Sequence, residues 1–144
     1  LERAGNSEHG SITAIYTVLV AGGDFEEPIA DEVRGILDGH ILLNRELANR
    51  NHWPAIDILP SLSRVMNMVA TAEHREDASS FRSVLAAYEK KRDLISLGAY
   101  EYGTDENVDR AIDLIADLEA FLRQDVHEST SFDETTALMS ELFR

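Results

Sequence analysis

The chain has 144 residues and a mass of 16.1 kDa, enough for one domain of ordinary size or for a small domain and part of another. It contains no cysteine, which excludes disulfide bonds, cysteine-based zinc sites and thiol nucleophiles. The net charge is −14, and residues 99–144 hold 12 acidic side chains against 3 basic ones. This charge argues against nucleic acid as a partner. It leaves open whether the acidic last third is a docking surface or a solvated face.

The first part of the chain shows a strand pattern that lacks visible partners. Residues 11–20 are mostly β-branched or aromatic and lie between glycines, which predicts a central strand buried on both faces of a parallel sheet. Few partner strands for it are apparent in the rest of the sequence. We therefore expect the chain to be a fragment of a longer protein, as its first residue, Leu1, also suggests.

Short helices and one more strand are expected next. Pro28 suits the first turn of a helix that continues through residues 29–37. The apolar run at residues 40–43 predicts a second buried strand, and residues 45–48 are expected to be helical. Residues 61–66 are predicted to form a short helix or a turn.

From about residue 71 the sequence predicts helices only. Apolar residues recur at helical spacing up to Gly98, which ends the first of them. A polar loop over residues 100–105 precedes the second helix, and the third begins at Ser131 with a glutamate three residues later, the spacing of a capping box. The residues predicted to face the core are Ala78, Phe81, Leu85, Tyr88, Ile95, Val108, Ala111, Ile112, Ile115, Leu118, Leu122, Leu138 and Leu142.

The predicted fold class is therefore α/β followed by all-α. The change of pattern places a boundary between residues 1–67, the end of an α/β domain, and residues 68–144, a small helical bundle. No run of apolar residues is long enough to cross a bilayer.

No short motif in the sequence carries catalytic chemistry. The five histidines are scattered without the HExxH spacing of a zinc site, so no metal site is predicted. The sequence also lacks GxSxG, the turn that carries a nucleophilic serine, and GxxxxGK[ST], the loop that binds nucleotide phosphates.

Two side chains nevertheless have the character of binding groups. Arg64 lies between small hydroxyl and apolar residues, and its guanidinium could bind phosphate or pair with a carboxylate such as Asp57. Trp53, the only tryptophan, could stack on a purine or cover an edge of the core. The residues alone leave these alternatives open.

Nearly the whole chain resembles the type III secretion and flagellar export ATPases. After about residue 126 it is more similar to the virulence-associated (injectisome) branch than to the flagellar one. The matching segments follow one another in the same order along both sequences: LERAGN at 1–6, GSITAIYTVLV at 10–20, EPIADEVR at 27–34, ILDGHI at 36–41, PAID at 54–57, SRVM at 63–66, LGAY at 97–100 and FLRQ at 121–124.

The resemblance implies a domain organisation. This family is similar to the catalytic subunits of rotary ATP synthases and forms homohexamers, with ATP bound between a P-loop domain and its neighbour. Residues 1–67 would be the C-terminal part of the P-loop (RecA-like) ATPase domain, and 68–144 its C-terminal helical domain. The phosphate loop and the Mg²⁺ ligands would lie outside this chain, so the chain alone is expected not to hydrolyse ATP.

The resemblance also assigns three residues and one loop. Arg64 matches the arginine finger, which acts in trans on the γ-phosphoryl group of ATP in the adjacent subunit. Trp53 stands where the family usually has the tyrosine that stacks on adenine, and Phe121 matches the aromatic residue on the other side of that pocket. The acidic loop at residues 100–107 corresponds to the tip that meets a central stalk.

The leading hypothesis is the C-terminal part of a cytoplasmic type III secretion ATPase, peripheral at the inner membrane. The intact protein would couple ATP hydrolysis to chaperone release, unfolding and export of effector proteins. Its implied partners are a stalk protein, chaperone–effector complexes and the sorting-platform proteins of the secretion apparatus. The alternatives are a flagellar export ATPase and an acidic helical interaction module without nucleotide chemistry.

Overall fold

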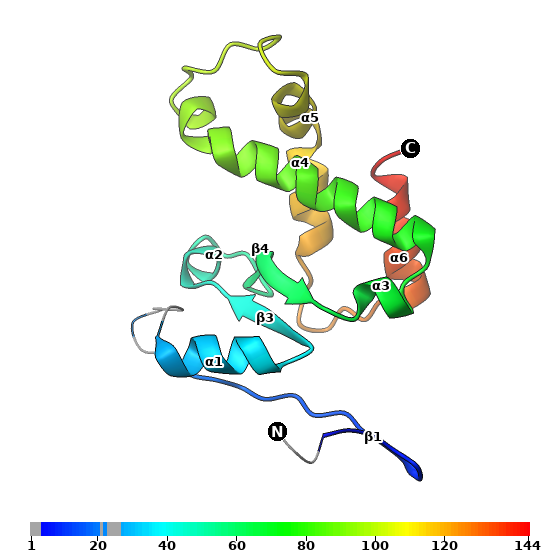
Figure 1. Cartoon of the computed structure of the whole chain (residues 1–144). Helices are drawn as coiled ribbons and strands as arrows, with labels where there is room; N and C mark the ends of the chain where they lie inside the picture. Colours follow the sequence, from blue (N-terminus) through cyan, green and yellow to red (C-terminus); the bar gives the residue numbers. More distant parts are fainter. Residues whose placement is uncertain (1–3, 21, 23–26) are drawn as a thin grey trace. The chain divides into compact units, whose positions relative to one another are not determined.

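The computed structural model describes residues 4–20, 22 and 27–144, which form two compact units divided after residue 37 (Figure 1). In the first unit, β1 (Gly5–Ser7) and β2 (Gly10–Ile12) form an antiparallel hairpin, and α1 spans Pro28–Ile36. The helix predicted after Pro28 is confirmed. Proline opens it because the first turn has no use for the missing N–H.

The prediction of a buried strand over residues 11–20 is wrong. Only its first two residues belong to β2, and residues 13–20 have no regular structure. Ile15 and Leu19 are 94% and 93% exposed. An apolar strand is buried on both faces only where neighbouring strands and covering helices surround it, and the described part of the chain provides neither for this segment.

The second unit begins with a two-stranded antiparallel sheet. It consists of β3 (Gly39–Leu43) and β4 (Ile56–Ser63), with α2 (Arg45–Asn49) between them. The second predicted strand is confirmed as β3, although Ile41 is 71% exposed, so this strand is not fully buried. The short helix or turn expected over 61–66 is wrong in its first half, since pairing with β3 extends β4 to Ser63.

The pairing of β3 with β4 is interrupted by a bulge. His40 pairs with Leu62, whereas Leu42 pairs with Asp57, so residues 58–61 of β4 lie opposite a single residue of β3. A bulge of this kind bends the strand and changes the direction in which its end points. The end in question carries Arg64.

Gly39 lets the two strands approach closely at the far side of the bulge. It pairs with Ser63, and a Cβ at this position would meet the carbonyl oxygen of Leu62 at 2.7 Å. The next hydrogen bond runs from the Arg64 N–H to the Asp38 carbonyl, at 2.7 Å. Glycine is therefore required where the backbone leading into Arg64 is held.

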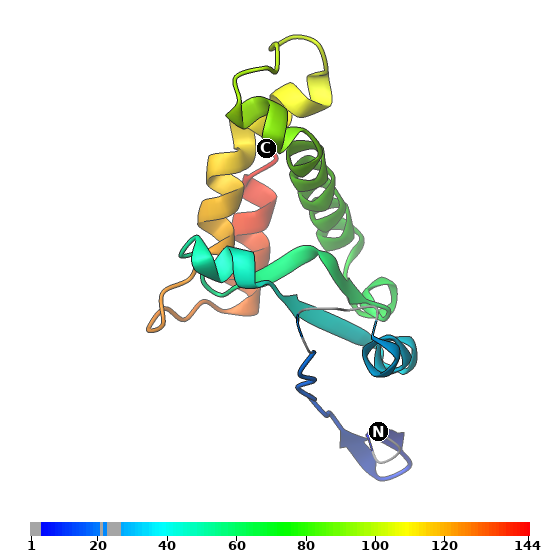
Figure 2. The ribbon, with the colours of Figure 1, turned by 90° about the vertical axis from the view of Figure 1, so that its left-hand side faces the viewer.

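Three helices complete the second unit, and all three were predicted. They are α4 (Ala72–Ser96), α5 (Glu106–Leu122) and α6 (Phe132–Glu141), with the short helix α3 (Met66–Val69) before them (Figure 2). The helix ends match the local signals in the sequence. Gly98 has a φ of 66°, and Ser131 forms the predicted capping box.

The core lies where α4, α5 and α6 meet. Its buried members are Phe81, Val84, Ala111, Leu118 and Met139. The part played by α6 differs from the prediction, because Leu138 is 49% exposed and Met139 is buried instead.

In the described residues, no helix combines the length and the apolar composition that a membrane span requires. Within the second unit α4 also contacts β4.

Candidate functional site

Arg64 lies at the C-terminal end of β4, between the strand and α3. Its backbone is fixed on the strand side by the Gly39–Ser63 pair and at its own N–H by the Asp38 carbonyl. The residue as a whole is exposed. A guanidinium on a well-fixed backbone at a surface is suited to binding a phosphate group supplied from outside this chain.

A second arginine, Arg82 of α4, holds the bulge that precedes Arg64. Its Nη1 atom donates hydrogen bonds to the carbonyls of Ile58 (2.6 Å) and Ser61 (3.2 Å), and its Nη2 atom donates to Leu59 (2.7 Å). These contacts join the long helix to the small sheet. Sequence reasoning missed Arg82, because no local pattern reveals a contact across more than 20 residues.

Trp53 precedes β4 and presents its ring at the surface. The residue is 53% exposed, which leaves much of the indole open to a planar ligand. Its carbonyl accepts a hydrogen bond from the backbone N–H of Gln124 at 2.9 Å. This bond brings the segment after α5, which follows Phe121, to the backbone of Trp53.

Phe121 belongs to the core as much as to the surface. It is half-buried near the end of α5, and its ring centre lies 5.5 Å from that of Phe81. The structure therefore brings the backbone of Trp53 together with the segment that follows Phe121. It places Arg64 at the opposite end of β4 from Trp53.

His52 is a buried histidine next to Trp53 that sequence reasoning did not single out. It is 5% exposed, and its backbone N–H donates to the carbonyl of Leu47. Burial and the positive charges of Arg123 and Arg50 lower the pKa of its imidazole below the ordinary value of 6.5, although Glu119 acts in the opposite direction. The folded chain therefore favours the neutral form of this side chain.

We expect His52 to make the chain less stable as the pH falls from about 8 to about 5. The unfolded chain takes up a proton near the ordinary pKa of histidine, whereas the folded chain takes it up only at lower pH. In that window the unfolded state holds more protons, so the free energy of unfolding decreases as the pH falls. Urea unfolding at a series of pH values measures this decrease in the free energy of unfolding.

The variant His52→Asn should show a smaller decrease over the same range. His127→Asn, at an exposed histidine, serves as the matched control and should keep the pH dependence of the unchanged chain. Identical slopes for the His52→Asn variant and the unchanged chain would contradict the prediction.

The acidic loop between α4 and α5 is organised by Asp109. Its two carboxylate oxygens accept hydrogen bonds from the Tyr100 hydroxyl (2.7 Å) and the Gly103 N–H (2.9 Å), and the residue is 8% exposed. Asp105 caps α5 by accepting from the N–H of Asn107. The loop lies at the end of the helical bundle distant from β3 and β4 (Figures 1 and 2).

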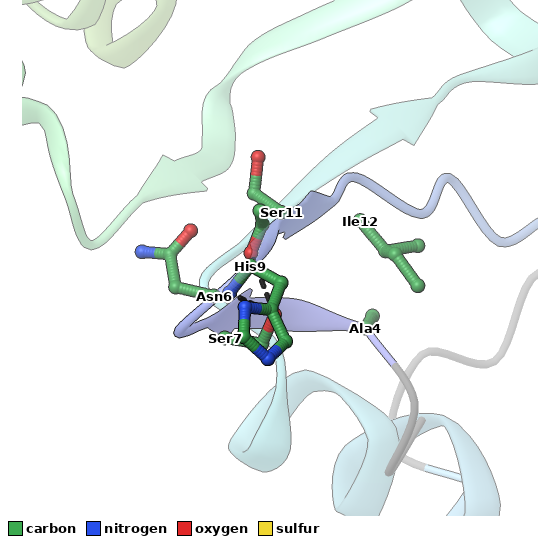
Figure 3. Close-up of a pocket in the computed structure, with 8 residues that line it drawn as sticks. Ala4, Asn6, Ser7, His9, Ser11 and Ile12 are labelled. Atoms are coloured by element: carbon green, nitrogen blue, oxygen red, sulfur yellow. Dashed lines mark hydrogen bonds between the residues drawn. The ribbon is translucent and has the colours of Figure 1, made fainter.

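A shallow hollow on the β1–β2 hairpin lies outside this site. Residues 4–7 and 9–12 line it, and its hydrogen bonds are local, from the Ser7 hydroxyl to the Gly10 carbonyl and from the His9 N–H to the Ser7 Oγ (Figure 3). It contains none of the predicted site residues. Among the described residues, no three acidic or histidine side chains are grouped so as to hold a metal ion.

The comparisons with known proteins cover almost the entire chain. The family described as the T3SS EscN ATPase C-terminal domain matches residues 70–141. The ATP synthase alpha/beta family, nucleotide-binding domain, matches residues 1–63.

Individual relatives align with nearly the whole of this chain. The Type 3 secretion system ATPase of Sinorhizobium fredii is 54% identical and the Flagellum-specific ATP synthase of Bacillus subtilis is 49% identical, each over 142 residues, or 99% of this chain and 32% of the relative. The chain thus spans about a third of the length of the curated relatives it matches.

A solved structure is similar to the chain in both fold and sequence. The assembled ATPase EscN in complex with its central stalk EscO, from the type III secretion system of enteropathogenic E. coli, superposes with a TM-score of 0.88. The two are 45% identical, over 99% of this chain and 33% of EscN. Family match, sequence identity and fold agree: the chain belongs to the family described as the T3SS EscN ATPase C-terminal domain, which matches half of its residues.

Proposed function

We propose that this chain is the C-terminal part of a type III secretion ATPase. The intact protein would couple ATP hydrolysis to the release of effector proteins from their chaperones, and to effector unfolding and export. Residues 1–67 would complete the nucleotide-binding domain, and residues 68–144 would form the C-terminal helical domain. The observation that carries the proposal is an exposed arginine, Arg64, fixed on the end of β4 within a chain of this family.

In this proposal Arg64 acts as an arginine finger toward the nucleotide bound by the neighbouring subunit. Bound ATP, with Mg²⁺, supplies the phosphoryl group that is transferred to water. The guanidinium stabilises the negative charge that develops on the phosphoryl oxygens, and a finger supplied in trans is typically worth about 10³- to 10⁵-fold in rate. The fixed backbone of Arg64 suits this role because a finger must be aimed before the reaction begins.

In this proposal Trp53 and Phe121 contact the adenine base of the nucleotide bound by their own subunit. The exposed indole of Trp53 offers a flat surface on which a purine can stack. Phe121 would support the other side, held in place by its contact with Phe81. The sequence has no GxxxxGK[ST] loop, so phosphate and Mg²⁺ would be bound by parts of the longer protein.

The acidic loop between α4 and α5 is the proposed contact with a central stalk. The relative EscN was solved with its central stalk EscO, and the negative charge of this loop would attract a basic partner. The same proposal places the intact protein in a homohexamer on the cytoplasmic side of the inner membrane. Chaperone–effector complexes and sorting-platform proteins would bind there.

Two measurements test the proposed function. Steady-state phosphate release should show ATP turnover by the full-length protein and none above buffer background by the chain of 144 residues alone. In the organism, deletion of the gene should abolish secretion of type III effectors, and the unchanged gene should restore it. Turnover by the chain alone would contradict the assignment of the phosphate site to the remainder of the protein.

Flagellar export is a second candidate function. It is supported by the Flagellum-specific ATP synthase of Bacillus subtilis, which is 49% identical over 99% of this chain. The same deletion strain separates the two candidates. Loss of motility with normal effector secretion would assign the protein to the flagellar apparatus, whereas the proposed function predicts the reverse.

A further inference from the structure

The bulge in β4 is held by side chains rather than by the sheet. Arg82 binds the carbonyls of Ile58, Leu59 and Ser61, and the Nε2 atom of His40 lies 2.9 Å from the carbonyl oxygen of Pro60. The carbonyls of all four bulge residues thus accept hydrogen bonds from side chains. These bonds, rather than a continuous ladder, determine the path of the backbone.

Arginine is well suited to this arrangement. Its planar guanidinium carries five N–H donors in a fixed fork, so one side chain can bind several carbonyls whose directions differ. Arg82 does so at 2.6, 2.7 and 3.2 Å. A lysine in its place would carry a compact charge that cannot span all three carbonyls.

The held bulge determines the direction of the backbone that enters Arg64. Only Leu62 and Ser63 separate Ser61, the last residue bound by Arg82, from Arg64. Both of them are paired with β3, and the N–H of Arg64 is itself bonded to the Asp38 carbonyl. The segment between the bulge and Arg64 is thus two residues long and paired throughout, so a shift of the bulge would be passed to Arg64 through the paired strand rather than absorbed by a loose segment.

We propose that Arg82 is a positioning residue for Arg64: from α4 it fixes the β4 bulge and so aims the guanidinium of Arg64 at the nucleotide of the neighbouring subunit. This inference rests on the proposed role of Arg64. It gives the helical domain a part in catalysis that does not require contact with the nucleotide.

The test is ATP hydrolysis by the full-length protein with Arg82→Met, which keeps most of the aliphatic stem and removes the donors. We expect kcat to fall about 10- to 10²-fold, the effect of misplacing a group by about 1 Å, and KM for ATP to stay within about twofold. Arg82→Lys should recover part of the loss. Arg92→Met, at a half-buried arginine of the same helix that pairs with Glu89, is the matched control and should keep the unchanged kcat.

The double variant distinguishes positioning from a general structural role. If Arg82 acts through Arg64, adding Arg82→Met to Arg64→Ala should reduce kcat no further. An equal loss in both backgrounds would overturn the inference, as would an unchanged kcat in Arg82→Met. A loss of kcat in Arg82→Met while Arg64→Ala is fully active would overturn both the inference and the finger role.

Folding is checked separately by thermal unfolding and by the size of the assembled protein. If Arg82→Met does not assemble, the same cycle is run with Arg82→Lys, which keeps the charge. A partial loss of kcat that disappears in the Arg64→Ala background supports the inference, and an unchanged kcat overturns it. The fate of the proposed function is read independently from Arg64→Ala alone.

Discussion

Replacement of Arg64 by alanine in the full-length protein should lower kcat for ATP hydrolysis about 10³- to 10⁵-fold. The side chain is exposed at the end of β4. In the proposed role its loss removes stabilisation of the transferred phosphoryl group, and thermal unfolding of the variant shows whether the fold is kept. KM for ATP should change much less than kcat, because the finger contributes mainly in the transition state. Phosphate release over a range of ATP concentrations measures both constants.

Two further variants make this result specific. Arg64→Lys keeps the positive charge but loses the planar fork, so it should restore only a small part of the activity. Arg92→Ala removes a half-buried arginine of α4 that pairs with Glu89, and should leave kcat unchanged. Normal hydrolysis by a folded Arg64→Ala variant would favour the other hypothesis, an acidic interaction module without nucleotide chemistry.

Replacement of Phe81 by alanine should destabilise the second unit by about 3–5 kcal/mol. Phe81 is 4% exposed, and its ring packs against those of Phe121 (5.5 Å between centres) and Phe143 (6.3 Å). The substitution leaves a cavity at the junction of α4, α5 and the C-terminal segment. Chemical denaturation of the purified chain, followed by circular dichroism, gives the change in the free energy of unfolding.

The matched control for this variant is another phenylalanine on the same unit. Phe132 is 70% exposed, and its ring and that of His74 form an edge-type pair with 5.6 Å between their centres. Phe132→Ala should therefore cost less than about 1 kcal/mol. Equal losses for the two variants would show that the packing around Phe81 is not the main source of stability.

The helices were predictable because their signals are local. Proline at the start of α1, a capping aspartate before α5, the capping box at Ser131 and the glycine after α4 all act within one turn. The apolar spacing in α4 and α5 also identified most of the core. It missed Val84 in α4, and in α6 it missed Met139 and included the exposed Leu138.

The strands were less predictable because pairing decides them. Residues 13–20 have a strand composition but no partner in the described residues, and they lack regular structure. Residues 61–63 have no strong strand signal, yet pairing with β3 makes them the end of β4. Composition gives a tendency, and the sheet determines whether it is realised.

For the candidate site, the sequence indicates which residues could bind a ligand but not the hydrogen bonds that hold them in place. Arg64 and Trp53 stand out in the sequence as unusual side chains, and the resemblance to a family implies their roles. The bonds of Arg82 to the bulge, and the bond from Gln124 to the carbonyl of Trp53, join residues distant in the chain. No spacing pattern could have predicted them.

The helix α5 has one end at the acidic loop and the other beside the only tryptophan. Asp109, in its first turns, binds Tyr100 and Gly103, and Gln124, just past its last turn, binds the carbonyl of Trp53. Its 17 residues make a stiff rod about 25 Å long. If a protein bound at the loop displaced α5, the segment bonded to the Trp53 carbonyl would move with the helix, and the fluorescence emission of Trp53 would measure that displacement.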